Sequence, residues 1–223
     1  MTTLQQVKKM IAPYFRSRGF RRKGNTFSYI KNNISYRIGF EMPTGLIYVT
    51  AYIVPLYIPC ECNYLSYGNR LSNLTKFEFP ILLKDASSEQ IEAWCQLLSN
   101  MLDTYILPFF EEIGSPAKLA EYLRHTPHPQ KEYLHCPQHQ IEQLIVYTYL
   151  YLLDVPKAAE ALMRYHNSVQ EPLLVDSYRK RLLTEVNCLS GLIRQGENSI
   201  EAYLAETISH TLQVLGEQPP STD

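Results

Sequence analysis

The chain has 223 residues, 45% of them hydrophobic and 19% charged, which is typical of a folded globular protein rather than a disordered one. This length allows one large domain or two small ones. The formal net charge of −1 argues neither for nor against a nucleic-acid partner. No apolar run approaches the ~20 residues that cross a bilayer, so we expect no membrane contact. The first ten residues lack the apolar stretch of a signal peptide.

The five cysteines are odd in number and scattered, at positions 60, 62, 95, 136 and 188. This pattern argues against a secreted disulfide scaffold and suits a reducing compartment. We therefore expect a cytoplasmic protein.

Charge is distributed unevenly along the chain. Residues 1–40 contain nine basic residues and no acidic one, whereas the remainder carries twelve basic and twenty-two acidic residues, a net charge of −10. No lysine or arginine follows Arg194. Either the two ends neutralise each other within the fold or a dimer, or the basic start is available to a partner.

The first half of the chain predicts a helix followed by strands. Apolar residues recur at helical spacing over 4–15, after a capping-box pattern and before Gly19, and Pro13 is expected to kink this helix. Strands are predicted over 26–30, 34–41 and 46–54, with a fourth candidate over 76–82. The first two are joined by a turn at Asn32 and Asn33, which tolerate positive φ. An antiparallel meander is the natural arrangement.

The second half predicts helices. Ser87 and Gln90 form another capping-box pattern ahead of one long apolar stripe over 88–113, and Ser115 with Pro116 begins a short helix. Further helices are predicted over 138–153, 155–167, 173–195 and 199–215. The fold class is therefore α+β: an antiparallel sheet packed on helices, followed by an all-α helical C-terminal domain. The expected division is 1–124, a proline-rich linker over 125–138, and 139–218.

Two segments carry a family resemblance. Pro13–Phe15 with Arg18–Phe27, and later Ile106–Phe110 followed by Ser115 and Pro116, resemble the opening and closing segments of a bacterial domain-of-unknown-function family, number 4304 among such families. The resemblance covers about residues 4–123 and implies a helix leading into strands. It implies no catalytic residue. The stretch 52–67, rich in tyrosine and proline, departs from the family pattern.

The C-terminal half loosely resembles helical-hairpin repeats of the tetratricopeptide type. Tyr149, Ala158 and Leu162 fall at the spacing of such a repeat, but Val146 and Tyr165 occupy positions where small residues are expected. A generic helical bundle explains the same pattern, so both alternatives stay open.

The expected linker contains five residues of the types that bind zinc: His125, His128, His135, Cys136 and His139. Their spacing matches no familiar zinc module, and a polar, proline-rich connector between domains explains the same residues without a metal. We therefore expect no metal and no other cofactor. No catalytic motif was recognised, so no catalytic residue is assigned.

Two features could bind a partner. The first is a basic run interleaved with aromatic residues. The basic side chains could bind phosphates while Phe20, Phe27 and Tyr29 stack on bases. The basic residues of this run are Arg16, Arg18, Arg21, Arg22 and Lys23. Alternatively, Phe20 and Phe27 are core residues and the cations complement a helix end. The second is a tyrosine-rich irregular segment in which Tyr57, Tyr64 and Tyr67 are expected at a recognition surface.

Together these patterns favour a non-catalytic, cytoplasmic bacterial protein that binds another protein, of an immunity-like or regulatory kind. The alternative is a nucleic-acid-binding module that uses the basic N-terminal edge. The sequence names no partner.

Overall fold

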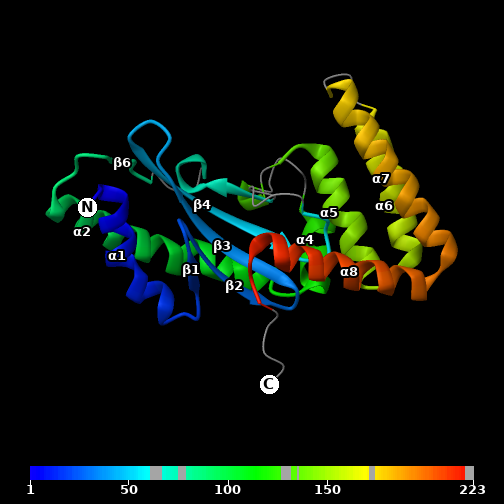
Figure 1. The fold of residues 1–223 in the computed structure, drawn as a ribbon, viewed down its shortest axis with the longest axis horizontal. Helices are drawn as coiled ribbons and strands as arrows, with labels where there is room; N and C mark the ends of the chain where they lie inside the picture. The colour runs from blue at the N-terminus through cyan, green and yellow to red at the C-terminus, as the bar shows by residue number, and fades with distance from the viewer. Residues whose placement is uncertain (61–66, 75–78, 127–131, 135, 171–173, 219–223) are drawn as a thin grey trace. The chain divides into compact units, whose positions relative to one another are not determined.

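The computed structural model describes residues 1–60, 67–74, 79–126, 132–134, 136–170 and 174–218 (Figure 1). The chain forms two compact units and passes between them several times. Unit 1 comprises Met1–Val54, Leu65–Gly114 and Lys131–His135, and unit 2 comprises Pro55–Tyr64, Ser115–Gln130 and Cys136–Asp223. The α+β class predicted from the sequence is confirmed, with an antiparallel sheet followed by a helical region.

Unit 1 is built on a six-stranded antiparallel sheet in the order β1-β2-β3-β4-β5, with β6 also pairing with β4. The strands are β1 (Arg21–Lys23), β2 (Thr26–Lys31), β3 (Ile34–Glu41), β4 (Leu46–Pro55), β5 (Tyr67–Arg70) and β6 (Leu82–Leu83). The strands expected over 26–30, 34–41 and 46–54 are present. Strands β1 and β5 were not anticipated. Of the fourth predicted strand, 76–82, residues 76–78 lie outside the described part of the chain, and Leu82 alone among the rest is in a strand.

The turn between β2 and β3 forms as the sequence predicts. Lys31 pairs with Ile34, and Asn32 and Asn33 between them have φ angles of 52° and 57°. Two consecutive positive φ values match the right-handed twist of a tight hairpin, and asparagine tolerates them better than most residues. The Asn32 side chain also donates a 2.7 Å hydrogen bond to the carbonyl of Gly114.

The helices of unit 1 are α1 (Thr3–Arg16), α2 (Ser88–Met101) and α3 (Leu107–Glu112). The capping boxes at Thr2 and Ser87 are both formed. The single helix expected over 88–113 is instead interrupted by a π-helical turn at Leu102–Ile106, where the Leu107 amide bonds to the Leu102 carbonyl five residues back. Pro108 explains the change, because it has no N–H to continue an α-helical ladder and its ring crowds the carbonyl four residues earlier.

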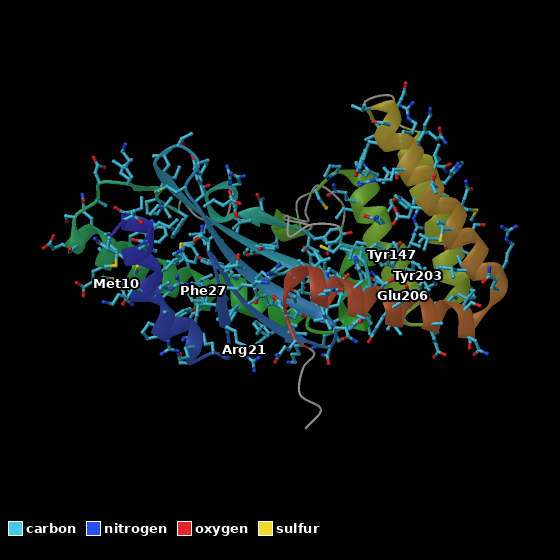
Figure 2. All side chains as sticks on the ribbon, in the orientation of Figure 1. Met10, Arg21, Phe27, Tyr147, Tyr203 and Glu206 are labelled. Carbon is cyan, nitrogen blue, oxygen red and sulfur yellow. The ribbon has the colours of Figure 1, made fainter. Side chains whose placement is uncertain are left out.

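Aromatic rings join the helices of unit 1 to one face of its sheet. Phe15 of α1 stacks on Phe27 of β2 with ring centroids 4.3 Å apart and meets Phe40 of β3 edge-on. Further along β3, Tyr36 packs on Phe110 of α3 at 5.1 Å. Phe27 therefore lies inside the layers, whereas Arg21 of β1 lies at the outer edge of the unit (Figure 2).

Unit 2 is helical. Its helices are α4 (Pro116–His125), α5 (Gln138–Tyr151), α6 (Val155–Val169), α7 (Asp176–Gln195) and α8 (Glu197–Leu215). Each packs on the next along the chain, and α8 also contacts α5 (Figure 1). Ser115 caps the N-terminus of α4 through its side chain, as predicted. Asp154 caps α6 in the same way, and Gly216 ends α8 with a left-handed conformation.

The segment 55–60 belongs to unit 2, although it follows directly on β4. Tyr57 stacks on Tyr151 of α5 at 4.5 Å, and the Ile58 carbonyl accepts a 3.1 Å hydrogen bond from Thr211 of α8. Within unit 1, Tyr133 stacks on Phe109 at 4.4 Å. The proposed linker role of 125–138 stays a prediction, since residues 127–131 and 135 lie outside the described part of the chain.

Candidate functional site

The basic run predicted as a binding edge is divided between a helix end, a turn and a strand. Arg16 and Arg18 lie at and just after the end of α1, and Arg21, Arg22 and Lys23 make up β1, the edge strand of the sheet. All five residues are exposed. Phe20 and Phe27 are buried, which agrees with the core interpretation of these two rings rather than the base-stacking one.

Arg18 is paired within unit 1. Its guanidinium makes a two-pronged contact with Asp103, with Nε–Oδ1 and Nη2–Oδ2 distances of 3.1 and 3.0 Å. It also lies 3.8 Å from the centre of the Tyr14 ring, whose hydroxyl donates a 2.8 Å hydrogen bond to the same carboxylate. Burial and this hydrogen bond raise the pKa of Tyr14 above its usual value. Asp103 lies in the π-helical turn, 85 residues after Arg18 in the sequence. No local pattern around Arg18 therefore predicts this ion pair.

The other three cations of this basic run, Arg21, Arg22 and Lys23, are of the type commonly found on edge strands. Exposed charges on a strand with an open side hinder pairing with a foreign strand. Arg22 donates through Nε to the Gly24 carbonyl at 3.2 Å, which holds its side chain along the turn. Nearby, Lys8 is buried and donates to the Asn25 side chain, and burial together with the Arg22 charge lowers the pKa of Lys8.

The expectation that the irregular tyrosines form a recognition surface is wrong for the two that the structure describes. Tyr57 is fully buried in unit 2, where its hydroxyl lies 3.2 Å from Thr148 Oγ1. Tyr67 is buried in β5 and pairs with Ile53. Both rings are buried by tertiary packing, because removing the apolar area of a large aromatic side chain from water stabilises the folded state. Tyr64 lies outside the described residues.

The histidine-rich segment is described only in part. His125 ends α4 and is exposed, Cys136 is buried before α5, and His139 is buried on α5, edge-on to the Tyr178 ring at 5.7 Å. His128 and His135 lie outside the described residues. Within the described ranges, no three His, Cys, Asp or Glu side chains are grouped so that they could hold a metal ion. The prediction that the protein binds no metal stays a prediction.

A polar cluster inside unit 2 joins four helices. The carboxylate of Glu185 on α7 accepts hydrogen bonds from Tyr147 of α5 at 2.8 Å and Tyr165 of α6 at 2.7 Å, and from the Gln143 amide at 2.8 and 2.9 Å. Tyr203 of α8 completes it, 3.3 Å from the Tyr147 hydroxyl, and Figure 2 labels both rings. Burial and the Glu185 charge raise the pKa of Tyr147 well above its usual value. These groups satisfy one another, as buried polar groups must.

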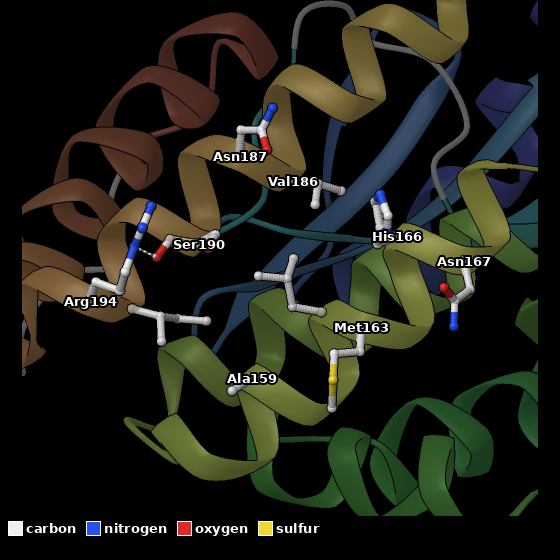
Figure 3. Close-up of a pocket in the computed structure, with 10 residues that line it drawn as sticks. Ala159, Met163, His166, Asn167, Val186, Asn187, Ser190 and Arg194 are labelled. Atoms are coloured by element: carbon white, nitrogen blue, oxygen red, sulfur yellow. Dashed lines mark hydrogen bonds between the residues drawn. The ribbon is translucent and has the colours of Figure 1, made fainter.

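Unit 2 has an open groove between α6 and α7, with a volume of about 530 Å³ (Figure 3). Met163 lies on it and is 63% exposed, whereas its neighbours Leu162 and Val186 are buried. The groove is lined by Ala159, Leu162, Met163, His166, Asn167, Val186, Asn187, Ser190, Ile193 and Arg194.

Among the described residues that line this groove, the ionisable ones are His166 and Arg194, both of the basic type. Arg194 donates through Nε to the Ser190 carbonyl at 3.2 Å, the contact dashed in Figure 3. His166 lies 3.4 Å from the Gln170 amide one turn further along α6. No carboxylate is among the described residues that line the groove. An apolar floor beside the guanidinium of Arg194 favours an apolar ligand that also carries negative charge.

Unit 1 has a second groove, of about 630 Å³, between α2 and the segment around β6. It exposes Ile81, Leu83 and Leu97, and Trp94 lies under it with its indole N–H bonded to the Pro80 carbonyl at 2.8 Å. Of the lining residues within the described ranges, Asp85 is the charged one. This groove is apolar, but its chemistry does not distinguish one kind of occupant from another.

Sequence reasoning missed both Met163 and Glu185. Met163 stands on a helix predicted correctly, but its exposure depends on how far α6 and α7 separate at that level. Glu185 and its donors are spread over 42 residues, and no motif links them. An apolar side chain on the hydrophilic side of a predicted helix is the signal that could have identified Met163.

Comparisons with known proteins add no relative: no family model, no curated protein and no solved structure matches the chain. The resemblances to the unknown-function family and to tetratricopeptide repeats therefore stay predictions. Among the described residues, no helix is both long enough and apolar enough to span a membrane.

Proposed function

We propose that this is a cytoplasmic bacterial binding protein, immunity-like or regulatory in kind, which holds another protein and has no chemistry of its own. The α6/α7 groove is the partner surface of this proposal. The observation that carries it is the exposure of Met163 above a floor of buried apolar residues. Methionine is flexible and polarizable, so it adapts to the side chains of a partner, and exposed apolar patches on a folded protein commonly mark interfaces.

Site-specific crosslinking in cells tests this proposal. A photoreactive amino acid replaces Met163 in the full chain, and a matched chain carries it at Val175, which is 70% exposed and precedes α7. We expect a discrete adduct with one protein from position 163 and none of that adduct from position 175. Filling the groove with Ala159→Trp should remove the adduct.

Two outcomes contradict the proposal. Equal adducts from both positions would mean that the contacts are non-specific. No adduct at position 163, in a chain shown to be folded by its circular dichroism, would mean that the groove is not a partner surface.

A second candidate function, nucleic-acid binding, is favoured by one observation: Arg21, Arg22 and Lys23 are exposed side by side on β1. The burial of Phe20 and Phe27 removes two of the rings that would stack bases. Fluorescence anisotropy with labelled single-stranded RNA and double-stranded DNA tests it, and we expect no binding at physiological salt. Salt-sensitive micromolar binding, lost when all three residues become glutamate, would reverse the ranking.

A further inference from the structure

The walls of the α6/α7 groove have the spacing of a helix-binding surface. On α6, the lining residues Ala159, Met163 and His166 recur every three or four positions, and on α7 Val186, Ser190 and Ile193 do the same. Each wall therefore presents about two helical turns along one line, roughly 10 Å. Apolar anchors of a partner helix at i, i+3 or i+4, and i+7 match this length.

The two helices that form the groove carry more basic than acidic residues, in a chain whose net charge is −1. Together α6 and α7 hold six lysines and arginines and three carboxylates, a net charge of +3. All three carboxylates are occupied within the unit. Glu160 pairs with Arg164 at 2.7 Å, Asp176 with Arg179 at 3.1 Å, and Glu185 accepts from the buried tyrosines.

Three of these cations are ion-paired as well: Lys157 with Asp154, Arg164 with Glu142 and Arg179 with Asp176. The charge that the groove offers to an acidic partner is therefore that of Arg194, which has no carboxylate partner among the described residues. Arg194 lines one end and is held by its bond to the carbonyl of Ser190, so its guanidinium is positioned with terminal N–H groups able to meet a carboxylate. His166 provides a further ring nitrogen that can donate. A basic partner helix would meet repulsion here and would find no carboxylate among the described lining residues.

From this spacing and charge we infer that the groove binds an amphipathic helix of another protein, with apolar residues facing Met163 and carboxylates near Arg194. This inference rests on the proposed function and adds the chemistry of the partner to it. A second copy of this chain and a basic helix are the competing occupants.

Two model peptides test the inference directly. Both are about 18 residues long, roughly five helical turns, with the same leucine and alanine face; one carries glutamate and the other lysine on its flanks. Anisotropy titrations use the full chain at low salt. We expect the glutamate peptide to bind at least about ten-fold more tightly than the lysine peptide. Arg194→Glu should remove most of this preference, whereas Arg21→Glu, an equal charge change on β1, should leave it unchanged.

The competing results are distinct. Equal or tighter binding of the lysine peptide overturns the inference, and so does an equal effect of Arg194→Glu and Arg21→Glu. A crosslink from position 163 to a second copy of the chain, or to a partner whose contacting segment is basic, overturns the acidic helix but leaves the groove as an interface. Absence of any specific crosslink at position 163, together with no binding of either peptide, overturns the proposed function as well.

Discussion

Tyr165 on α6 donates a 2.7 Å hydrogen bond to Glu185 on α7, and this contact lies where the helices of unit 2 converge. The same carboxylate accepts from Tyr147 and Gln143 of α5, so one acidic side chain organises donors from two neighbouring helices. Both tyrosine rings are fully buried. Such a cluster fixes the register of the helices, because displacing any helix by one turn would leave buried polar groups without partners.

Replacing Glu185 with alanine should therefore destabilise unit 2 strongly. The change leaves two buried hydroxyl groups and an amide without their acceptor, and we expect a loss of about 3 kcal/mol in the free energy of unfolding. Glu185→Gln keeps one acceptor oxygen and should cost less. Urea denaturation followed by far-ultraviolet circular dichroism measures both. Glu206→Ala, an exposed residue on α8, is the control and should change stability by no more than about 0.5 kcal/mol. Equal effects of the two alanine variants would contradict a structural role for the cluster.

Tyr29 should make unit 1 less stable at high pH. Burial, with a smaller contribution from Glu111, raises the pKa of Tyr29 to about 12, against about 10 in an unfolded chain. Between these values the unfolded chain binds fewer protons than the folded one, so the free energy of unfolding falls as pH rises from 10 to 12. The contribution is fully present below pH 10. Denaturation at a series of pH values should show a smaller fall for Tyr29→Phe, with the same slope as the wild type between about pH 7 and 9. An unchanged fall above pH 10 would contradict this assignment.

Arg18 and Asp103 should be energetically coupled, because their side chains make two hydrogen bonds and Tyr14 packs on the same pair. Both are part-exposed, so we expect a coupling of no more than about 1 kcal/mol from a double-mutant cycle of alanine variants. A parallel cycle of Arg21 with Asp103 is the matched control, and it should show no coupling. Equal coupling in the two cycles would point to a general charge effect rather than this contact.

Two glycines should respond to alanine in opposite directions. Gly68 on β5 pairs with Tyr52, and a methyl group there would run into Tyr52 Cβ and the Ala51 carbonyl of β4. Gly68→Ala should cost about 1–3 kcal/mol, measured through the fluorescence of Trp94, the single tryptophan, which lies in unit 1. Gly191 lies inside α7 with nothing within 4 Å of an added methyl, so Gly191→Ala should stabilise unit 2 by up to about 1 kcal/mol. A neutral Gly68→Ala would mean that β4 and β5 can separate without cost.

Cleavage between residues 125 and 138 should not release a free N-terminal part. The sequence predicts a protease-sensitive linker there and a folded fragment over 1–124. Residues 55–60, which belong to that fragment, are packed in unit 2 through Tyr57 and the Ile58 carbonyl. We expect the two pieces to elute together in native size exclusion after cleavage and to separate in urea.

Tyr57→Ala is the matched variant for this experiment. It removes the ring that stacks on Tyr151 and the hydrogen bond to Thr148, and we expect a cost of about 3 kcal/mol and easier separation of the pieces. Separation of the wild-type pieces under native conditions would show that the segment 55–60 contributes little to holding them together.

Sequence patterns predicted those helices, strands and turns whose stabilising interactions join residues close together in the sequence. Capping boxes at Thr2 and Ser87, the asparagine turn after β2 and most helix bounds in unit 2 all depend on residues within a few positions of one another. The errors have tertiary causes. β1 is a three-residue strand of exposed cations that forms only because β2 lies beside it. The π-helical turn at Leu102–Ile106 places Asp103 against Arg18 of a distant segment.

Local sequence patterns were enough to predict the α+β class, the positions of most helices and strands, and the basic character of the N-terminal region. These follow from periodicity, capping and composition, which act over short stretches of chain. Long-range packing, in contrast, buries Tyr57 and Tyr67 and gives Arg18 a carboxylate partner. It also brings two tyrosines to Glu185 and leaves Met163 exposed at a groove. Burial and pairing depend on which surfaces meet across long separations in sequence, and no local pattern contains that information.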